Sequence, residues 1–254
     1  MRVAMSGHSR WSQIKRKKGK TDVQRGKLFS KILREITVAA RNGGGDPKGN
    51  VRLKAATEAA RAANMPADNI KRAIQKGTGE LPGEQYEEIT YEGYGPAGVA
   101  VLLRVLTDNK NRTGPEIRHL FEKNGGHMGT AGCVAWMFER RGVITADALR
   151  IKEDELLEKA LEAGATDVRQ VEKLFEIATA PDEMETVRQA LERQGVPVVE
   201  AQVDMVPQST VRVEGKDAAA VLRLIEALED QDDVQSVHSN YDIADEVIDA
   251  ITAA

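Results

Sequence analysis

The pattern of apolar and polar positions along the chain changes near residue 84. Before this point, apolar residues recur every three to four positions, which is typical of helices with one buried face. Capping residues, glycines and prolines divide this part into three stretches. The pattern predicts helices over residues 21–42, 50–63 and 66–77. Because the second and third stretches are rich in alanine, we expect a small all-α domain of closely packed helices.

After residue 84, short strands alternate with helices. The nearly continuous apolar run 99–106 predicts a buried strand, and the strict alternation over 199–205 predicts a half-exposed strand. Further strands are expected at 174–178, from residue 211 and at 234–237, and a short pair of strands is expected at 134–138 and 143–145, around residues 140–142. One further helix is expected to begin at a capping box at 113–116, and others to cover 156–164, 181–195 and 221–228. This order predicts an α+β fold with two ferredoxin-like domains, in which helices cover one face of each sheet.

Composition narrows the class of protein. Of the 254 residues, 41% are hydrophobic, which is too many for a wholly disordered chain, and no apolar run approaches the roughly 20 residues of a membrane-spanning helix. Cys133 is the single cysteine, which excludes a disulfide framework and a zinc site built from cysteines. The N-terminal residues lack an apolar signal segment and a transit-peptide pattern. We therefore expect a cytoplasmic protein with no membrane partner and no obligate protein partner.

Charge divides the chain more sharply than its net value of −4 suggests. Residues 1–80 hold 19 Lys+Arg and 6 Asp+Glu, a net charge of +13, whereas residues 81–254 carry −17. Clustered positive charge attracts polyanions and accelerates their association. The segregation therefore predicts that the N-terminal part binds nucleic acid.

The residues expected to contact nucleic acid lie in two places. In the N-terminal part, lysines and arginines of a basic run and of the first helix would neutralise phosphates, and Arg10 and Trp11 offer planar groups for stacking on an unpaired base. The second place is the segment 107–112, expected to be a loop, for which turn formation by Asp and Asn is the alternative explanation. The candidate nucleic-acid-binding residues are Arg10, Trp11, Lys15, Arg16, Lys17, Lys18, Lys20, Arg25, Lys27, Lys31, Arg34, Asn109, Lys110, Asn111 and Arg112.

Two motifs resemble nucleotide-binding sequences but lack the context that those sites need. Residues 93–98 match G-x-G-x-x-G, which requires a helix immediately afterwards, yet a strand-like run follows. We therefore interpret 93–98 as a loop between two strands. Residues 19–21 end like a phosphate-binding loop, but Ile14 stands where that motif requires glycine. The four histidines show no metal-ligand spacing, and no Ser/His/Asp arrangement is readable, so we predict neither an enzyme nor a cofactor.

Several segments together resemble the YebC family. They are GHSRW at 7–11 with the basic run after it, IKRAI at 70–74, GTGE at 77–80, YEGYGP at 91–96, LTDNKNRT at 106–113, the glycines 125–126 and GCVAWMF at 132–138. These segments follow one another in order over nearly the whole chain. Two features depart from the family pattern: Met5 is a second candidate initiator besides Met1, and Cys133 stands where serine is common.

The resemblance implies three domains, one of which is inserted in another. The implied division is a basic helical nucleic-acid-binding domain at 1–80, a middle α+β domain at 81–132 plus 205–241, an inserted acidic α+β domain at 133–204, and a C-terminal tail at 242–254. Bacterial members of the family are catalogued as probable transcriptional regulators, and mitochondrial relatives act as translational activators of a cytochrome oxidase subunit. The resemblance thus implies a non-enzymatic regulator of gene expression.

The sequence leaves the target of this regulator open. One alternative is DNA, and the other is ribosomal RNA or tRNA, bound by a translation factor that relieves stalling at proline-rich stretches. In the second case the 109–112 segment would approach rRNA or tRNA as a further contact. Two other classes are an enzyme that uses Asp108 and Arg112 and a sensor that binds a small molecule between its ferredoxin-like domains, but the sequence shows neither an acidic metal cluster nor a pocket.

Overall fold

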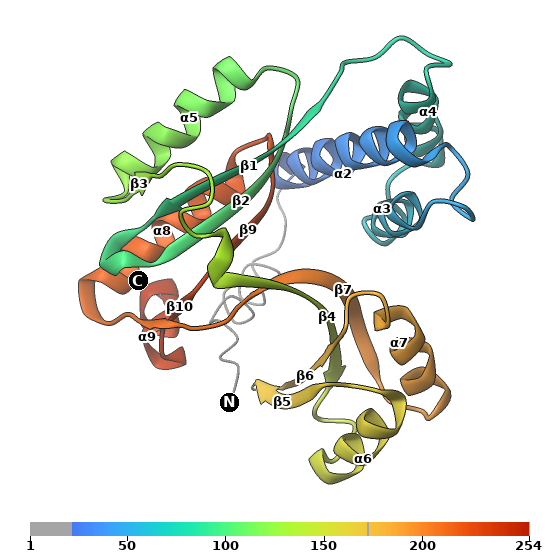
Figure 1. Ribbon diagram of the computed structural model, residues 1–254, viewed down its shortest axis with the longest axis vertical. Coiled ribbons are helices and arrows are strands. Elements are labelled where there is room, and N and C mark those ends of the chain that lie inside the picture. The colour runs from blue at the N-terminus through green and yellow to red at the C-terminus, as the bar shows by residue number, and fades with distance from the viewer. Residues whose placement is uncertain (1–21, 172, 254) are drawn as a thin grey trace. The chain divides into compact units, whose positions relative to one another are not determined.

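The computed structural model describes residues 22–171 and 173–253, which form two compact units (Figure 1). One unit is Trp136–Thr210, and the other combines residues 22–135 with residues 211–253, so the first is inserted in the chain of the second. Helices come first and mixed helices and strands follow, which confirms the predicted fold class. The exact domain boundaries expected from the sequence stay predictions.

The helical region of the larger unit contains α2 (Asp22–Gly43), α3 (Val51–Ala62) and α4 (Ala67–Thr78). Its core comprises Ile36, Ala39 and Ala40 of α2 with residues from both shorter helices. The predicted cap of α3 is confirmed, because the Asn50 side chain accepts a hydrogen bond from the Leu53 amide at 3.0 Å. Gly77 permits the close approach of α4 to α2, because a Cβ built there would lie 2.7 Å from the Cβ of Ala40.

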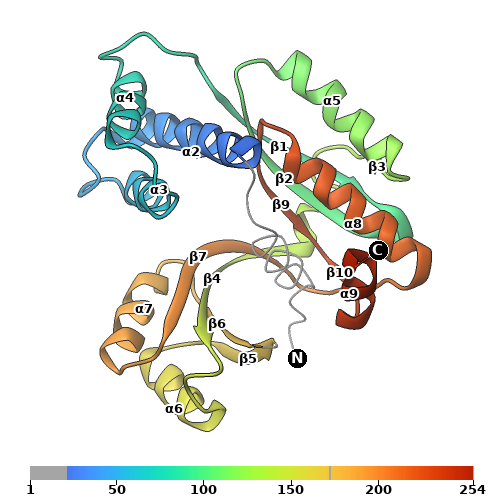
Figure 2. The ribbon, with the colours of Figure 1, turned by 180° about the vertical axis from the view of Figure 1, so that it is seen from behind.

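The sheet of the larger unit has the order β3-β1-β2-β9, and every neighbouring pair is antiparallel. Its strands are β1 (Glu87–Tyr94), β2 (Ala100–Thr107), β3 (His127–Met128) and β9 (Val234–Ser239). The helices α5 (Lys110–Lys123) and α8 (Gly215–Asp230) share one hydrophobic core with the alternate residues Val101, Leu103 and Val105 of β2 (Figures 1 and 2). Both helices therefore cover the same face of the sheet, as predicted.

Short elements complete the larger unit. The 3-10 helix η1 (Pro96–Gly98) joins β1 to β2, so a strand and not a helix follows the glycine motif, as predicted. The predicted loop is shorter than 93–98, because Gly93 and Tyr94 are the last two residues of β1. The strands β8 (Val211–Arg212) and β10 (Tyr241–Asp242) form a parallel pair, and the helix α9 (Asp245–Ala253) follows them. Ile248 of α9 is buried in the same core as α8, so part of the segment expected only as a C-terminal tail packs on this unit.

The beginning of α5 differs from the prediction. The helix begins at Lys110 with Asn109 as its N-cap, three residues before the predicted capping box at 113–116, and the Asn109 side chain accepts a hydrogen bond from the Arg112 amide at 3.2 Å. The prediction was wrong because the Thr113 hydroxyl is buried and bonds to other groups, Thr107 at 2.7 Å among them. The second half of the segment expected as a loop is therefore the first turn of α5.

The inserted unit has the element order β-α-β-β-α-β of a ferredoxin-like fold. Its elements are η2 (Ala135–Met137), β4 (Phe138–Asp147), α6 (Glu153–Ala163), β5 (Asp167–Val171), β6 (Leu174–Thr179), α7 (Met184–Arg193) and β7 (Val198–Pro207). The sheet order is β5-β6-β4-β7, and Ile144, Phe175 and Ile177 pack against residues of both helices. The four strands of the larger unit's sheet, β3-β1-β2-β9, are arranged in the same way. In position, β3 corresponds to β5, β1 to β6, β2 to β4 and β9 to β7.

Two expectations about the inserted unit were wrong. Residues 134–145 do not form a pair of strands around 140–142, because β4 is one continuous strand that includes Gly142. Glycine is required at position 142 for close packing and not for a turn, since a Cβ there would lie 2.6 Å from the Cβ of Met184. The strand β5 was not predicted, because its five residues contain only two apolar positions, Val168 and Val171.

Candidate nucleic-acid interface

The helical region carries exposed cations that have no acidic partner among the residues that the structure describes. Lys54 and Arg61 lie on α3, and Lys71, Arg72 and Lys76 lie on α4. None of these five side chains forms an ion pair or a hydrogen bond with another described residue. Unpaired cations on a surface are available to neutralise the phosphates of a nucleic acid.

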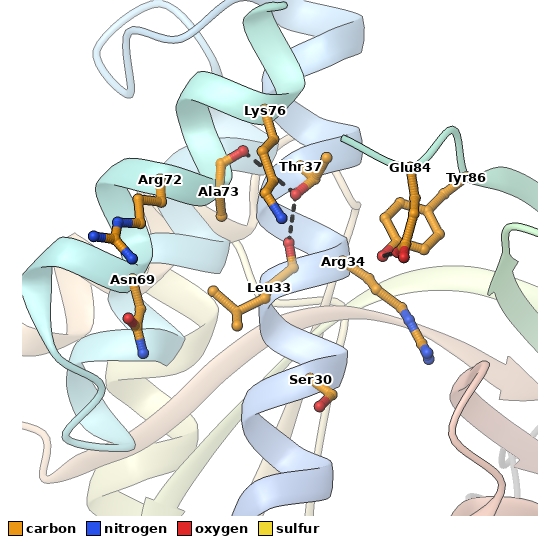
Figure 3. Close-up of a pocket in the computed structure, with 10 residues that line it drawn as sticks. All are labelled: Ser30, Leu33, Arg34, Thr37, Asn69, Arg72, Ala73, Lys76, Glu84 and Tyr86. Carbon is orange, nitrogen blue, oxygen red and sulfur yellow. Dashed lines mark hydrogen bonds between the residues drawn. The ribbon is translucent and has the colours of Figure 1, made fainter. Parts of the chain in front are cut away.

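An open groove of about 510 Å³ lies between α2 and α4 (Figure 3). Arg72, Lys76 and Asn69 of α4 form one wall, and the segment after α4 contributes Glu84 and Tyr86 to the other. The rest of the lining comes from α2 (Ser30, Leu33, Arg34 and Thr37) and from Ala73 of α4. The sequence analysis assigned no individual contact role to Arg72 or Lys76, although their separation by four residues on a helix places both on one face.

The basic residues of α2 behave differently from those of α4. Lys27 Nζ donates to the Asp230 carbonyl at 3.0 Å, Lys31 Nζ donates to the Glu229 carbonyl at 2.5 Å, and Arg34 donates to the Asp232 carbonyl. The first two carbonyls belong to the last turn of α8 and the third follows that helix. Free carbonyls at a helix C-terminus carry partial negative charge, so these cations stabilise the contact of α2 with α8.

The guanidinium of Arg25, the remaining α2 candidate, lies over the Phe29 ring, 5.6 Å from its centroid. This residue is exposed. Of the four α2 candidates, three are therefore engaged by backbone carbonyls at or just after the end of α8, and Arg25 is engaged by an aromatic ring of its own helix.

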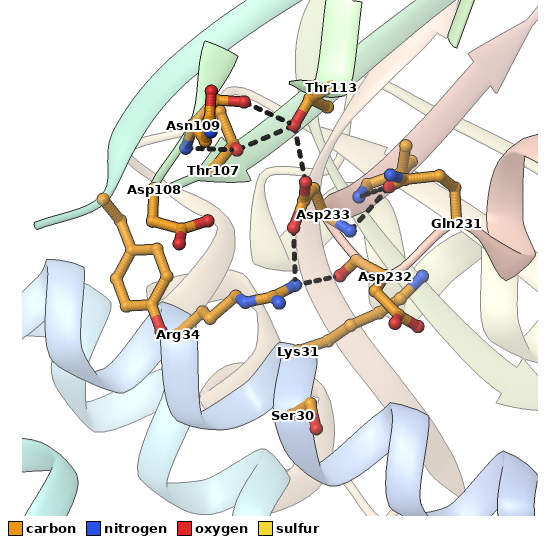
Figure 4. Close-up of polar contacts among 12 residues, drawn as sticks. Ser30, Lys31, Arg34, Thr107, Asp108, Asn109, Thr113, Gln231, Asp232 and Asp233 are labelled. Carbon is orange, nitrogen blue, oxygen red and sulfur yellow. Dashed lines mark hydrogen bonds and ion pairs between the residues drawn. The ribbon is translucent and has the colours of Figure 1, made fainter. Parts of the chain in front are cut away.

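The structure brings two of the predicted contact residues, Arg34 and Arg112, together at Asp233; Figure 4 shows Arg34 and Thr113 around this carboxylate. Arg34 Nη1 lies 3.1 Å from one carboxylate oxygen of Asp233, and Arg112 Nη2 lies 2.7 Å from the other. The Thr113 hydroxyl donates to the second oxygen at 2.6 Å, and Asp233 is only 1% exposed. Burial raises the pKa of Asp233, but the Thr113 and Arg112 hydrogen bonds and the Arg34 charge outweigh it, so this pKa is lowered. Asp233 is therefore a charged link between α2, α5 and the start of β9.

Sequence reasoning missed Asp233, because nothing in the local acidic stretch distinguishes it from its neighbours. The partners that define it lie 120 and 199 positions earlier in the chain, at Thr113 and Arg34.

The other members of the 109–112 segment divide into two kinds. The Asn109 side chain caps α5, and Arg112 also pairs with Asp108 at 3.0 Å, so both have structural roles. Lys110 and Asn111 are exposed; the nearest ion-pair partner of Lys110 that the structure describes is Glu87, at 3.6 Å. Lys110 and Asn111 are thus the members of this segment that are most open to a ligand.

A network of four charged residues joins the helical region to the sheet. Arg52 of α3 pairs with Glu35 of α2 at 2.7 Å and with Glu88 of β1 at 2.9 Å, and Arg104 of β2 pairs with the same two carboxylates at 2.9 and 3.2 Å. Burial raises the pKa of Glu35 and of Glu88, but hydrogen bonds and charges from both arginines outweigh it, and both pKa values are lowered. The network therefore stabilises the larger unit only while the two carboxylates are ionised.

The described residues offer little support for catalysis. Burial and the Glu92 charge raise the pKa of the Cys133 thiol, which disfavours the thiolate that a nucleophile requires. Glu92 itself accepts three backbone hydrogen bonds, from Gly132 at 2.6 Å and from Val134 and Ala135 at 2.7 Å, so its role is to hold the chain before η2. Over residues 22–171 and 173–253 there is no cluster of three or more His, Cys, Asp or Glu side chains placed to hold a metal ion.

Part of the predicted site cannot be compared with the structure. Arg10, Trp11, Lys15, Arg16, Lys17, Lys18 and Lys20 lie outside the described residues, and their contact with nucleic acid stays a prediction. Within the described ranges, no helix is both long enough and apolar enough to cross a membrane.

Comparison with known proteins gives matches over almost the whole chain. Residues 9–80 match a family profile described as the TACO1/YebC protein N-terminal domain, and residues 86–241 match one described as the TACO1/YebC second and third domain. A protein of Pelotomaculum thermopropionicum named "probable transcriptional regulatory protein" is 58% identical over 95% of this chain and 100% of its own length. A protein of Desulfotalea psychrophila with the same designation is 56% identical over 97% and 99% of the two chains.

A solved structure supports the same relationship. The crystal structure of a conserved hypothetical protein from Aquifex aeolicus is similar with a TM-score of 0.80 and 52% sequence identity, and the match covers 89% of this chain and 93% of the other. Sequence identity of this degree over nearly complete chains, together with both profile matches, shows common descent. The chain belongs to the TACO1/YebC family.

Proposed function

We propose that this protein is a non-enzymatic, nucleic-acid-binding regulator of gene expression that binds through its basic N-terminal region. Relatives that are more than half identical are named probable transcriptional regulatory proteins, which supports the regulatory class. The observation that carries the proposal is the group of exposed cations on α3 and α4 without acidic partners among the described residues. These cations belong to the segment 1–80, whose net charge is +13.

The arrangement of α3 and α4 favours contacts with phosphates over readout of bases. The two helices are joined by four residues, 63–66, as in a helix-turn-helix, whose second helix reads base edges with its N-terminal residues. Here the first turn of α4 begins with Ala67 and Asp68, and its cations follow at Lys71, Arg72 and Lys76. Such a helix is suited to binding a nucleic acid by its backbone and shape, and much less to reading an operator sequence.

This feature favours a second candidate function. A ribosome-associated translation factor that binds rRNA or tRNA, activates translation or relieves stalling at proline-rich stretches would also need shape and phosphate recognition without an operator. Lys110 and Asn111 would then be a further RNA contact of the same protein. Crosslinking followed by sequencing of the bound nucleic acid separates the two candidates, because it reports duplex DNA sites in one case and ribosomal RNA or tRNA in the other.

The contribution of the N-terminal basic run is tested by replacing Lys15, Arg16, Lys17 and Lys18 with alanine. We expect weaker binding of the full-length protein to nucleic acid and a smaller dependence of log K on log salt, by about 0.7 to 0.9 for each phosphate that the variant no longer neutralises. Unchanged affinity and unchanged salt dependence would contradict the assignment of this run.

A further inference from the structure

We propose that the groove between α2 and α4 binds one nucleotide of a single-stranded nucleic acid, with its phosphate on Arg72 and Lys76 and its base toward Glu84 and Tyr86. The inference deepens the proposed function and depends on it, because it assigns a specific site within the basic region.

The α4 wall of the groove has the properties of a phosphate site. Arg72 and Lys76 are one helical turn apart, are exposed, and have no acidic partner among the described residues. Their helix is held firmly in place, since Ile70 and Ala73 are buried against α2 and Gly77 allows close packing. Asn69, on the same wall, adds an amide that can donate to a phosphate or sugar oxygen. The wall therefore presents three donors to a phosphate from a rigid element.

The opposite wall has a different chemistry. The Tyr86 hydroxyl donates to Glu84 at 2.5 Å, and burial and the Glu84 carboxylate raise the pKa of Tyr86 to about 12, so the phenol stays neutral. Arg34, which lies 5.8 Å from the Tyr86 ring centroid, is already paired with Asp233. A carboxylate repels a phosphate but accepts hydrogen bonds from a base amino group or a ribose hydroxyl. The charge difference between the walls therefore fixes the orientation of the nucleotide.

The size and floor of the groove fit a single nucleotide. Its volume of about 510 Å³ lies within the range of small-ligand pockets, roughly 300 to 1,000 Å³. Leu33 and Ala73 give the floor an apolar part, and the Thr37 hydroxyl lies within hydrogen-bond distance of the Leu33 and Ala73 carbonyls, at 2.9 and 3.3 Å. The bases of a duplex are paired with each other, whereas those of a single strand are free to enter such a groove. The geometry thus favours a single strand over a duplex.

The test compares two double variants with the same change of charge. Arg72→Ala/Lys76→Ala removes the cationic wall, whereas Lys54→Ala/Lys71→Ala removes two exposed cations of the same helical region that do not line the groove. The probes are a fluorescently labelled 12-nucleotide RNA, a DNA of the same sequence, and the corresponding DNA duplex. Because all four side chains are exposed, we expect both variants to keep the wild-type circular dichroism spectrum and melting temperature.

We expect the groove variant to bind the single strands about tenfold more weakly and to lose about 0.7 from the salt slope, as for one phosphate that is no longer neutralised. The control variant should lose a smaller factor, about three, because Lys54 and Lys71 lie on different helices and contribute to the general attraction of phosphates without sharing one phosphate site. Photocrosslinking of a 4-thiouridine probe should label residues 84–86 in the wild type and in the control but not in the groove variant. RNA bound better than DNA would indicate a contact to the ribose hydroxyl.

The outcomes separate this site from the proposed function. Equal losses of affinity in the two double variants, or crosslinks only outside residues 69–86, would overturn the groove assignment. The proposed function would still stand in that case, provided that the wild-type protein binds nucleic acid. A wild-type protein that binds none of the three probes, nor nucleic acid recovered by crosslinking in cells, would overturn the proposed function itself.

Discussion

The helices α2 and α4 are both basic and lie side by side in the helical region, yet their cations have different roles. In α2, Lys27, Lys31 and Arg34 are bound by carbonyls at the end of α8 or just beyond it. In α4, Arg72 and Lys76 have no partner among the described residues and line an open groove. The comparison teaches that the number of cations in a segment does not give the number available to a ligand.

The inserted unit extends this comparison, because several of its cations are paired with acidic residues of the same unit. Arg188 pairs with Glu185 at 2.7 Å and with Glu192 at 2.6 Å, and Lys159 pairs with Glu155 at 2.7 Å, all within single helices. Acidic residues are abundant there and scarce in residues 1–80. Surplus positive charge therefore remains where few acids are present to pair with it.

The largest effect on stability is expected at the carboxylate that binds Arg34. Replacing Asp233 with alanine leaves two arginines and Thr113 without their buried partner, and we expect the free energy of unfolding to fall by about 3 kcal/mol. We place the value at the lower end of the range for buried pairs because both arginines are partly solvated. Chemical denaturation measures the change. Asp232→Ala is the matched control, since that side chain is exposed and should change stability little; equal effects of the two substitutions would refute the role given to Asp233.

A somewhat smaller effect is expected where α4 touches α2. Gly77→Ala introduces a Cβ 2.7 Å from that of Ala40 and still closer to the Thr37 carbonyl, and we expect a loss of about 2 kcal/mol from overpacking. Gly26→Ala in α2 is the control, because its added Cβ meets no atom of the described residues within 4 Å apart from its chain neighbours and its own helix backbone, and a gain of about 0.5 to 1 kcal/mol is expected from helix propensity. Thermal melts of the two variants should shift in opposite directions. A Gly77→Ala variant with the same melting temperature as the wild type would show that α2 and α4 are not tightly packed.

Acid should weaken the link between the helical region and the sheet. The pKa values of Glu35 and Asp233 are lowered from their ordinary values of 4.5 and 3.8, so their stabilising contribution is complete above about pH 5 and is lost as the pH falls through the lowered values. Glu35→Gln should remove part of this dependence, about 1 kcal/mol at pH 7, and flatten the stability profile between pH 5 and 3. Glu58→Gln on the exposed face of α3 serves as control. A profile with the same slope in wild type and Glu35→Gln would contradict the role of the network.

Features fixed by local chemistry could be predicted from the sequence. Asn50 caps α3, and Gly164 ends α6 in the left-handed conformation, because each of these roles depends on a few neighbouring residues. The helix expected to end at Gly77 instead continues to Thr78 and is capped by Gly79 in the left-handed conformation. Gly142 was misread as a turn because the side chain that requires a glycine there, Met184, lies 42 positions later. The start of α5 was misplaced for the same reason, since Thr113 bonds to Asp233 instead of capping its own helix.

The candidate site shows the same limit. The sequence indicated the basic region and its partner class from charge alone, and it singled out Arg34 and Arg112 individually. It could not show that both converge on Asp233, nor that Arg72 and Lys76 face a groove closed on its other side by Glu84 and Tyr86. These relations depend on the packing of helices that are distant in the chain, which no local pattern encodes.

The most direct test of the account measures stability and nucleic-acid affinity together in two variants with equal changes of charge. Lys27→Ala/Lys31→Ala removes cations bound to the end of α8, and Arg72→Ala/Lys76→Ala removes cations of the groove. We predict that the α2 variant unfolds about 1 kcal/mol more easily with an affinity loss below about threefold, and that the α4 variant keeps its stability and binds about tenfold more weakly. Equal losses of affinity in the two variants would contradict the claim that availability, and not the number of cations, determines binding.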